Sequence, residues 1–218
     1  MTRHGPIEIE GYVLGAYGTN CYLLRSSEDA SIPPAIVDCG ESPAALLDAA
    51  ERCETPPSVI VLTHAHVDHI AGLFNARKRF PDAPIWIHEN EGDWLTDARL
   101  NLSMFSGSEV TAPPAGRLLK DGEKVELAGV AWEVRHTPGH SPGSVSLYNA
   151  AAGIVLAGDA LFNGSIGRTD FPGCSFEQLE RSIRDRLYSL PDETTVYPGH
   201  GPSTTIGREK ATNPFVRP

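Results

Sequence analysis

The sequence predicts an α/β fold in which two packed sheets carry helices on their outer faces. Short runs of β-branched and aliphatic residues recur along the chain, and helical stretches separate them. Both halves show strand clusters flanked by helices, which is typical of layered folds. The 218 residues can bury a full core, and no linker, repeat or low-complexity segment divides them, so we expect one domain over residues 1–218.

Apolar and β-branched runs predict the strands of the first half. The plainest is Ser58–Leu62, which is short, apolar and β-branched and ends at Thr63. The proline-rich patch at 32–34 is short and is interpreted as a loop. The strands expected here lie near 7–14, 20–25, 35–38, 58–62 and 85–87, and the helices near 43–53, 70–80 and 89–98.

The second half repeats this organisation. Residues 153–157 form another buried apolar run, and a carboxylate, Asp159, follows it. The proline-rich patch at 111–114 is again interpreted as a loop. The strands expected here lie near 124–127, 130–136, 144–148, 153–157 and 194–197, and the helix at 175–188.

Residues 63–69, Thr-His-Ala-His-Val-Asp-His, concentrate three imidazoles and a carboxylate at the end of a predicted strand. In an extended chain, residues two apart face the same side, so His64 and His66 can converge on one ion. Asp68 and His69 are adjacent and point in different directions, so they would serve a second ion. The helix expected at 70–80 begins here, and its first-turn N–H groups also favour anions.

Other strand ends supply further ligands. The tripeptide Pro-Gly-His occurs twice, and each Pro-Gly turn presents an imidazole, that of His140 or that of His200. With Asp159, this gives five histidines and two aspartates at strand ends. Imidazole and carboxylate without thiolate suit zinc, iron or manganese in an open, hydrolytic site. Seven ligands exceed the needs of one tetrahedral ion, whereas two ions about 3.5–4 Å apart, bridged by a carboxylate and a hydroxide, would use them all.

This pattern resembles the metallo-β-lactamase superfamily, and within it the hydroxyacylglutathione hydrolases, or glyoxalase II. The resemblance implies an αββα four-layer sandwich and two divalent ions, most readily zinc, with iron or manganese as alternatives. It assigns His64, His66 and His140 to one ion, Asp68, His69 and His200 to the other, and Asp159 to the bridge between them.

The resemblance extends beyond the ligands. Segments 18–23, 35–40, 161–173 and 197–215 are similar to the short bacterial type of glyoxalase II. Longer members carry a helical carboxy-terminal domain that contacts glutathione, and we expect no such domain in this chain. The family implies that Asp38 supports the ligand shell and that Arg168 binds substrate, although Asp38 could cap a turn and Arg168 could pair with Asp170. Asp68 is the candidate proton shuttle.

The activity expected from this resemblance is metal-dependent hydrolysis of glutathione thioesters, with S-lactoylglutathione giving lactate and glutathione. A hydroxide between two cations forms near neutral pH and can attack the acyl carbonyl. The thiolate leaves readily because the pKa of a thiol is about 8.5. The alternatives are a mononuclear-iron persulfide dioxygenase, a lactone hydrolase of the same fold or, in a different class, a metal-storing or interaction protein.

Composition excludes several other classes. A net charge of −10 argues against nucleic acid, and no run approaches the ~20 apolar residues of a membrane span. Residues 1–6 lack the apolar core of a signal peptide, and the four cysteines form no CxxC pair, so we expect a cytoplasmic protein. Its expected partner is a small-molecule thioester, while the sequence does not determine the oligomeric state. We expect no catalytic role for Cys174 and a supporting or structural role for His136.

Overall fold

The first of two stacked β-sheets belongs to the amino-terminal half of the chain, and the computed structural model describes residues 1–105, 107 and 109–218. Its strands lie side by side in chain order. Pairing is antiparallel from β1 to β4 and parallel from β4 to β7. The strands are β1 (Thr2–His4), β2 (Ile7–Leu14), β3 (Thr19–Ser26), β4 (Ala35–Val37), β5 (Val59–Val61), β6 (Ile85–His88) and β7 (Arg117–Leu119).

The second sheet has the order β15-β14-β11-β10-β9-β8, in which only the β11–β14 pair is parallel. A separate hairpin, β12 (Leu161–Phe162) and β13 (Ser165–Ile166), follows β11. The strands of this sheet are β8 (Lys124–Leu127), β9 (Val130–His136), β10 (Val145–Asn149), β11 (Ile154–Gly158), β14 (Thr195–Pro198) and β15 (Thr204–Thr205).

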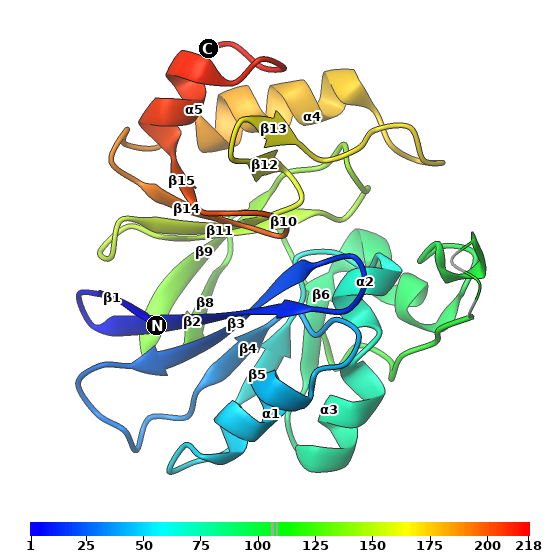
Figure 1. Cartoon of the computed structure of the whole chain (residues 1–218), viewed down its shortest axis with the longest axis vertical. Coiled ribbons are helices and arrows are strands. Elements are labelled where there is room, and N and C mark those ends of the chain that lie inside the picture. Colours follow the sequence, from blue (N-terminus) through cyan, green and yellow to red (C-terminus); the bar gives the residue numbers. More distant parts are fainter. Residues whose placement is uncertain (106, 108) are drawn as a thin grey trace.

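Helices cover the outer faces of both sheets, so the layers run αββα (Figure 1). This order confirms the predicted four-layer sandwich. The first sheet carries α1 (Ala44–Glu51), α2 (Val67–Ile70) and α3 (Leu73–Arg79); the second carries α4 (Phe176–Ser182), which continues as a π-helix (Ile183–Leu187), and α5 (Ile206–Thr212). Two short 3₁₀ helices, Glu89–Thr96 and Ser103–Phe105, follow β6.

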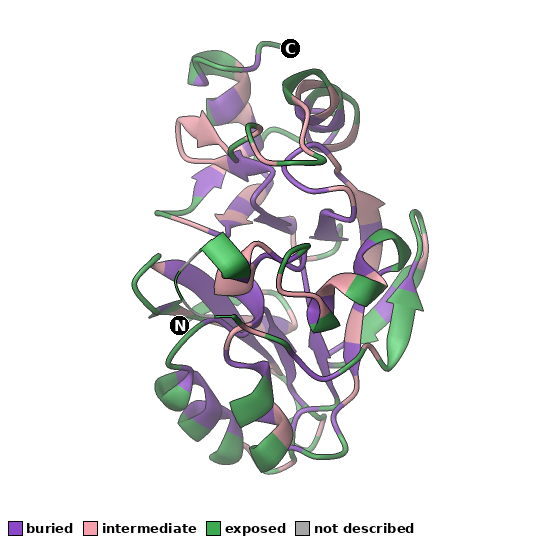
Figure 2. Ribbon diagram, turned by 90° about the vertical axis from the view of Figure 1, so that its right-hand side faces the viewer, coloured by how far each residue is buried: buried purple, intermediate pink, exposed green. Residues whose placement is uncertain are grey.

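Three hydrophobic clusters hold these layers together, and the alternation of side chains along each strand creates them. In β3, Leu23 faces the helices while Leu24 faces the second sheet. In β11, Leu156 faces the first sheet and Val155 faces α4. Figure 2 shows the buried residues concentrated in the sheets, with exposed residues on the outer sides of the helices.

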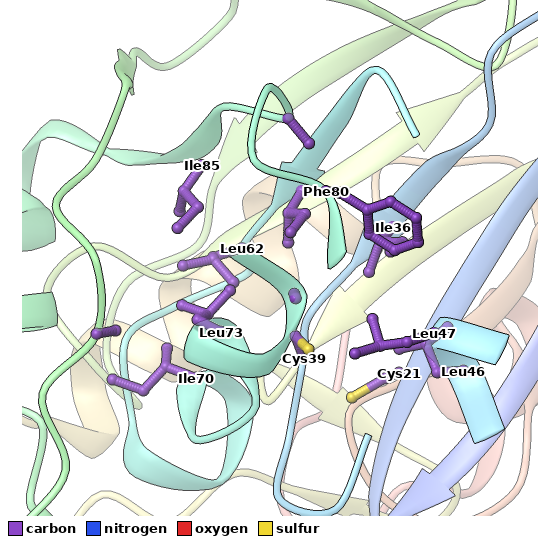
Figure 3. Packing of buried hydrophobic residues seen from close by; sticks show 14 of the residues in the cluster. Cys21, Ile36, Cys39, Leu46, Leu47, Leu62, Ile70, Leu73, Phe80 and Ile85 are labelled. Carbon is purple, nitrogen blue, oxygen red and sulfur yellow. The ribbon is translucent and has the colours of Figure 1, made fainter. Parts of the chain in front are cut away.

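Helices α1 and α3 attach to the first sheet through large aliphatic side chains. Figure 3 shows Leu46 and Leu47 of α1 and Leu73 of α3 pointing into the same cluster as Ile36 of β4. All four are at most 1% exposed. Truncating such a leucine to alanine typically costs about 2–5 kcal/mol of stability. This packing holds α1 and α3 against the first sheet. The histidine-rich segment follows β5 of the same sheet.

The predicted strands are confirmed, but two helix predictions need correction. The helix expected at 70–80 is two helices, because the Gly72 N–H donates to Cys39 O (2.8 Å) instead of continuing the helical ladder. The segment expected as a helix at 89–98 is a 3₁₀ helix ending at Thr96, where Asp97 N bonds to Trp94 O three residues back. Short elements without a periodic pattern were not predicted, namely β1, β7, β12, β13, β15 and α5.

Over the described residues, no helix combines the length and apolar character needed to cross a membrane.

Candidate metal centre

The seven side chains predicted as metal ligands come together where loops leave the carboxyl ends of the strands. His64 and His66 follow β5, and Asp68 and His69 lie in the first turn of α2. The remaining three come from the second sheet and follow β9, β11 and β14: His140, Asp159 and His200. Both sheets therefore contribute to one site.

Three overlapping groups of ligand atoms form within this site, each with its atoms within 4.8 Å of one another. The first and third correspond to the two ligand sets predicted from the sequence, and the second contains the predicted bridge. The groups are His64, His66 and His140; His64, His69 and Asp159; and Asp68, His69 and His200. The structure thus brings all seven predicted residues together.

Three of these buried atoms form no hydrogen bond, although His69 Nε2 lies 3.3 Å from Asp159 Oδ1 and 3.4 Å from Asp68 Oδ2. Among the described residues, His64 Nε2, His69 Nε2 and Asp159 Oδ1 are buried without a hydrogen-bond partner. Leaving such a group unsatisfied costs about 1–3 kcal/mol. The rings of His66 and His140 meet with Nδ1 and Nε2 2.8 Å apart. Imidazole and carboxylate atoms directed at common points fit divalent cations of the zinc, iron or manganese type.

Hydrogen bonds behind the rings fix which nitrogen each imidazole presents. His140 Nδ1 lies 2.8 Å from the carbonyl oxygen of Arg168, which can only accept, so Nδ1 carries the proton and Nε2 keeps its lone pair. His69 Nδ1 likewise donates to Asp38 Oδ2 at 2.8 Å. The Nε2 atom of His69 is therefore a potential ligand.

Asp38 also reaches His64, through Thr63. The Thr63 N–H and Oγ1–H each donate to Asp38 at 2.8 Å, so Thr63 Oγ1 can accept the proton of His64 Nδ1 at 3.1 Å. One buried carboxylate thereby orients two imidazoles. Asp38 has a φ of +59°, a left-handed conformation that aspartate tolerates better than most residues. Of the two interpretations of Asp38, the geometry fits the support of the ligand shell.

Asp68 is held at the third group by two polar contacts. Its Oδ2 accepts a hydrogen bond from Thr19 Oγ1 at 2.8 Å and lies 3.1 Å from His200 Nε2. Burial would raise the pKa of Asp68, but the neighbouring His69 and the bonds from His200 and Thr19 lower it below its usual range. Conversely, burial would lower the pKa of His200, whereas its bonds to Asp159 and Asp68 raise it to about 9.

Strand β3 of the first sheet locks the loop that presents His200. Asn20 Nδ2 donates to Pro198 O (3.0 Å) and to Gly201 O (2.8 Å), and the Asn20 N–H donates to Gly199 O (2.7 Å). Glycine is required at 199, because a Cβ there would lie 2.0 Å from Asp159 Oδ1. At this Pro-Gly-His turn the backbone therefore passes close to the Asp159 carboxylate.

A cavity of about 660 Å³ opens onto five of the seven side chains. Arg168 lines it as predicted, and its guanidinium also forms two bonds to Asp170, of 2.9 and 2.8 Å, and stacks 4.3 Å from the ring centre of Phe171. Both interpretations of Arg168 are thus compatible with its position. The other non-ligand walls are mostly apolar: Tyr17, Val67, Leu102, Phe105, Phe162, Ile166, Phe171 and Pro172.

Two residues with undecided roles have structural partners. His136 stacks on His88 with ring centres 4.1 Å apart and lies 2.9 Å from Pro142 O, so it supports the loop after His140. The Cys174 thiol is half-buried and donates to His140 O at 2.7 Å. Burial raises the pKa of Cys174, which argues against a reactive thiolate.

Sequence reasoning did not assign Thr19, Asn20 or Thr63 to the site. Each is at most 9% exposed, and each holds a ligand or a ligand loop. Polar residues at the ends of apolar strands were the available signal. Their partners, however, lie on other elements, and spacing along the chain does not reveal them.

A four-layer sandwich with imidazoles and carboxylates at its strand ends defines a class of metal-dependent hydrolases. The chain belongs to the metallo-β-lactamase superfamily, whose family model matches residues 14–200. It is similar to the probable metallo-hydrolase YqgX of Bacillus subtilis (strain 168), with 41% identity over 204 residues, covering 93% of this chain and 94% of YqgX. The hydroxyacylglutathione hydrolase GloC of Haemophilus influenzae is 33% identical over 212 residues, covering 96% of this chain and 98% of GloC.

Solved structures agree with this assignment. The BLEG-1 B3 metallo-β-lactamase superposes with a TM-score of 0.89 at 39% identity, covering 96% of this chain and 99% of BLEG-1. TTHA1623 in a di-iron-bound form gives a TM-score of 0.83 at 37% identity, covering 95% of this chain and 100% of TTHA1623. The chain is thus a metallo-hydrolase, and its fold implies divalent metal binding at the histidine-rich loops.

Proposed function

We propose that this chain hydrolyses thioesters of glutathione and converts S-lactoylglutathione to lactate and glutathione. The observation that carries the proposal is the convergence of seven imidazole and carboxylate side chains, five of which line one cavity and three of which have buried atoms that form no hydrogen bond. The likeness to GloC over almost the full length of both chains supports glutathione thioesters as the substrate class.

Two divalent ions are the cofactors in this proposal, most readily zinc, with iron or manganese as alternatives. Bound there, they would lower the pKa of water and polarise the acyl carbonyl. His64, His66 and His140 would hold one ion, Asp68, His69 and His200 the other, and Asp159 would lie between them.

Hydrolysis forms a bond between a water oxygen and the acyl carbon, breaks the C–S bond and releases the thiol. A proton must pass from the attacking water to the departing sulfur. We assign this transfer to the carboxylate of Asp68, which lines the cavity and stays ionised because His69, His200 and Thr19 lower its pKa. An Asp68→Asn variant with both metals and full turnover would exclude this role.

The cavity suits a substrate with apolar and anionic parts. Its aromatic and aliphatic walls can bury an acyl group. Among the described lining residues, Arg168 is the one lysine or arginine, and its side chain is 66% exposed, so it remains open to a glutathione carboxylate. Substrate binding at Arg168 is therefore part of the proposal.

The test is hydrolysis of S-lactoylglutathione by the zinc-loaded protein and by two histidine variants. His66→Ala removes a proposed ligand and should abolish turnover. His136→Gln removes an imidazole outside the seven and keeps a donor for Pro142 O, so it should retain turnover. Negligible turnover by the fully loaded wild type, or equal loss in both variants, would overturn the proposal.

A further inference from the structure

Glu91, in the 3₁₀ helix after β6, is a carboxyl side chain with 0% exposure. A buried carboxylate is costly unless it is paired or hydrogen-bonded. In the described part of the chain, Glu91 forms no ion pair with a lysine or arginine, and its carboxylate accepts two backbone hydrogen bonds and a side-chain hydrogen bond from Ser141 instead. Ala65 N–H donates to Oε2 and Gly143 N–H donates to Oε1, both at 2.6 Å.

The two donors belong to the two loops that present the first ligand group. Ala65 lies between His64 and His66, and Gly143 lies in the loop that follows His140. Along the chain, Ala65 and Gly143 are 26 and 52 residues from Glu91. One carboxylate thus connects the backbones that carry all three imidazoles, and the ring atoms His66 Nδ1 and His140 Nε2 meet 2.8 Å apart.

The packing around Gly143 indicates that this contact is built into the fold. A Cβ at position 143 would lie 2.7 Å from Glu91 Cγ and 2.9 Å from Cδ. Gly143 does not have a positive φ, so the close approach of the Glu91 side chain, and not a turn conformation, requires glycine here.

We propose that Glu91 is a positioning residue that sets the distance between the His64–His66 segment and the His140 loop, and so preorganises the first metal-binding group. Glu91 itself is not a member of any candidate ligand group. It acts through hydrogen bonds from two backbone N–H groups. A bound metal ion cannot take the place of the carboxylate in these bonds. The inference concerns metal binding, and it holds whichever substrate the enzyme uses.

Glu91→Gln is the most informative substitution, because it preserves the shape of the side chain and replaces one acceptor oxygen with an NH₂ group. In Glu91→Gln the side-chain NH₂ must face one of the two N–H donors, so one loop loses its bond. The loops stay linked elsewhere, since Val145 N donates to Thr63 O at 2.8 Å, so we expect the variant to fold. Loss of such an outer-shell contact typically weakens metal affinity about 10–100-fold.

Glu209→Gln is the matched control. Glu209 is also 0% exposed, and its carboxylate accepts bonds from Thr204 Oγ1, Gly164 N and Asn213 Nδ2, none of which belongs to a metal-binding loop. A purely structural role predicts that both variants lower thermal stability and leave metal affinity unchanged.

The experiment is a competition titration of zinc against a chromophoric chelator, together with the visible spectrum of the Co²⁺-loaded protein. The proposal expects Glu91→Gln to lose at least about tenfold in the affinity of one ion and to change the Co²⁺ bands, while Glu209→Gln retains both. Wild-type affinity in Glu91→Gln, or equal losses in the two variants, would overturn it.

A second measurement on the wild type applies even if Glu91→Gln fails to fold. Because the carboxylate and not the metal holds the loops, the amides of Ala65 and Gly143 should be protected from hydrogen exchange in the chelator-treated protein as well as in the loaded protein. Rapid exchange of both amides once the metal is removed would refute preorganisation by Glu91.

Discussion

Asp38→Asn isolates the hydrogen bonds that fix the tautomers of the candidate ligands. Asparagine has nearly the same shape and tolerates the left-handed backbone at this position, where φ is +59°. The native carboxylate accepts three bonds of 2.8 Å, from Thr63 N, Thr63 Oγ1 and His69 Nδ1. An amide offers only one oxygen, so at least one of these bonds is lost.

The expected effect of Asp38→Asn on metal affinity and stability depends on which hydrogen bond is lost. If the NH₂ group faces His69, Nδ1 must become an acceptor and the ring proton moves to Nε2, which then points into the metal site. If the amide is flipped, the buried Thr63 N–H loses its acceptor, at a cost of about 1–3 kcal/mol. In the first orientation we expect metal affinity to fall about 10–100-fold, which is about 1.4–2.8 kcal/mol, and in the flipped orientation we expect the loss in folding stability instead.

Chelator competition on the wild type and on Asp38→Asn measures the metal affinity, and denaturant unfolding measures the stability. The control is Asp29→Asn, because Asp29 is exposed and its carboxylate accepts bonds from the nearby Ser31. One orientation of the amide lowers metal affinity and the other lowers stability. Metal affinity of Asp38→Asn within twofold of the wild type, together with wild-type stability, would therefore refute the role given to Asp38.

Two further predictions concern backbone approach and pH. Gly199→Ala places a Cβ 2.0 Å from Asp159 Oδ1, so the variant should bind fewer than two metal ions per chain, as counted by elemental analysis; full occupancy would contradict the close approach. Burial, and then the neighbouring His136, lowers the pKa of His88 to about 4. Because the unfolded imidazole titrates at 6.5, this histidine takes up its proton more readily in the unfolded chain, and stability should fall as the pH drops from 6.5 through 4. His88→Asn keeps a side-chain cap for the 3₁₀ helix and should show a shallower acid limb in denaturant unfolding; an unchanged limb would contradict the assignment.

The sequence predicts the candidate ligands well because their signals are local. His64 and His66 share a face through the period of two of an extended chain, and His140 and His200 occur in repeated turns after strands. The pattern of apolar strands flanked by helices likewise predicts two packed sheets with helices outside. The loops that follow these strands then bring the ligands of both sheets together.

The supporting residues are not predictable in this way, because their partners are distant in the chain. Thr19 bonds to Asp68 across 49 residues, and Asn20 bonds to Pro198 across 178. The break between α2 and α3 has the same origin, since a backbone acceptor on another segment captures the N–H of Gly72. Tertiary contacts override local propensity at these positions.

The assignment of a dinuclear thioesterase is tested most directly by thiol release from S-lactoylglutathione, measured as zinc is added stepwise to the chelator-treated protein. We predict that turnover rises with bound zinc and reaches its plateau at about two ions per chain. A protein that carries two ions per chain and releases no thiol would contradict the assignment.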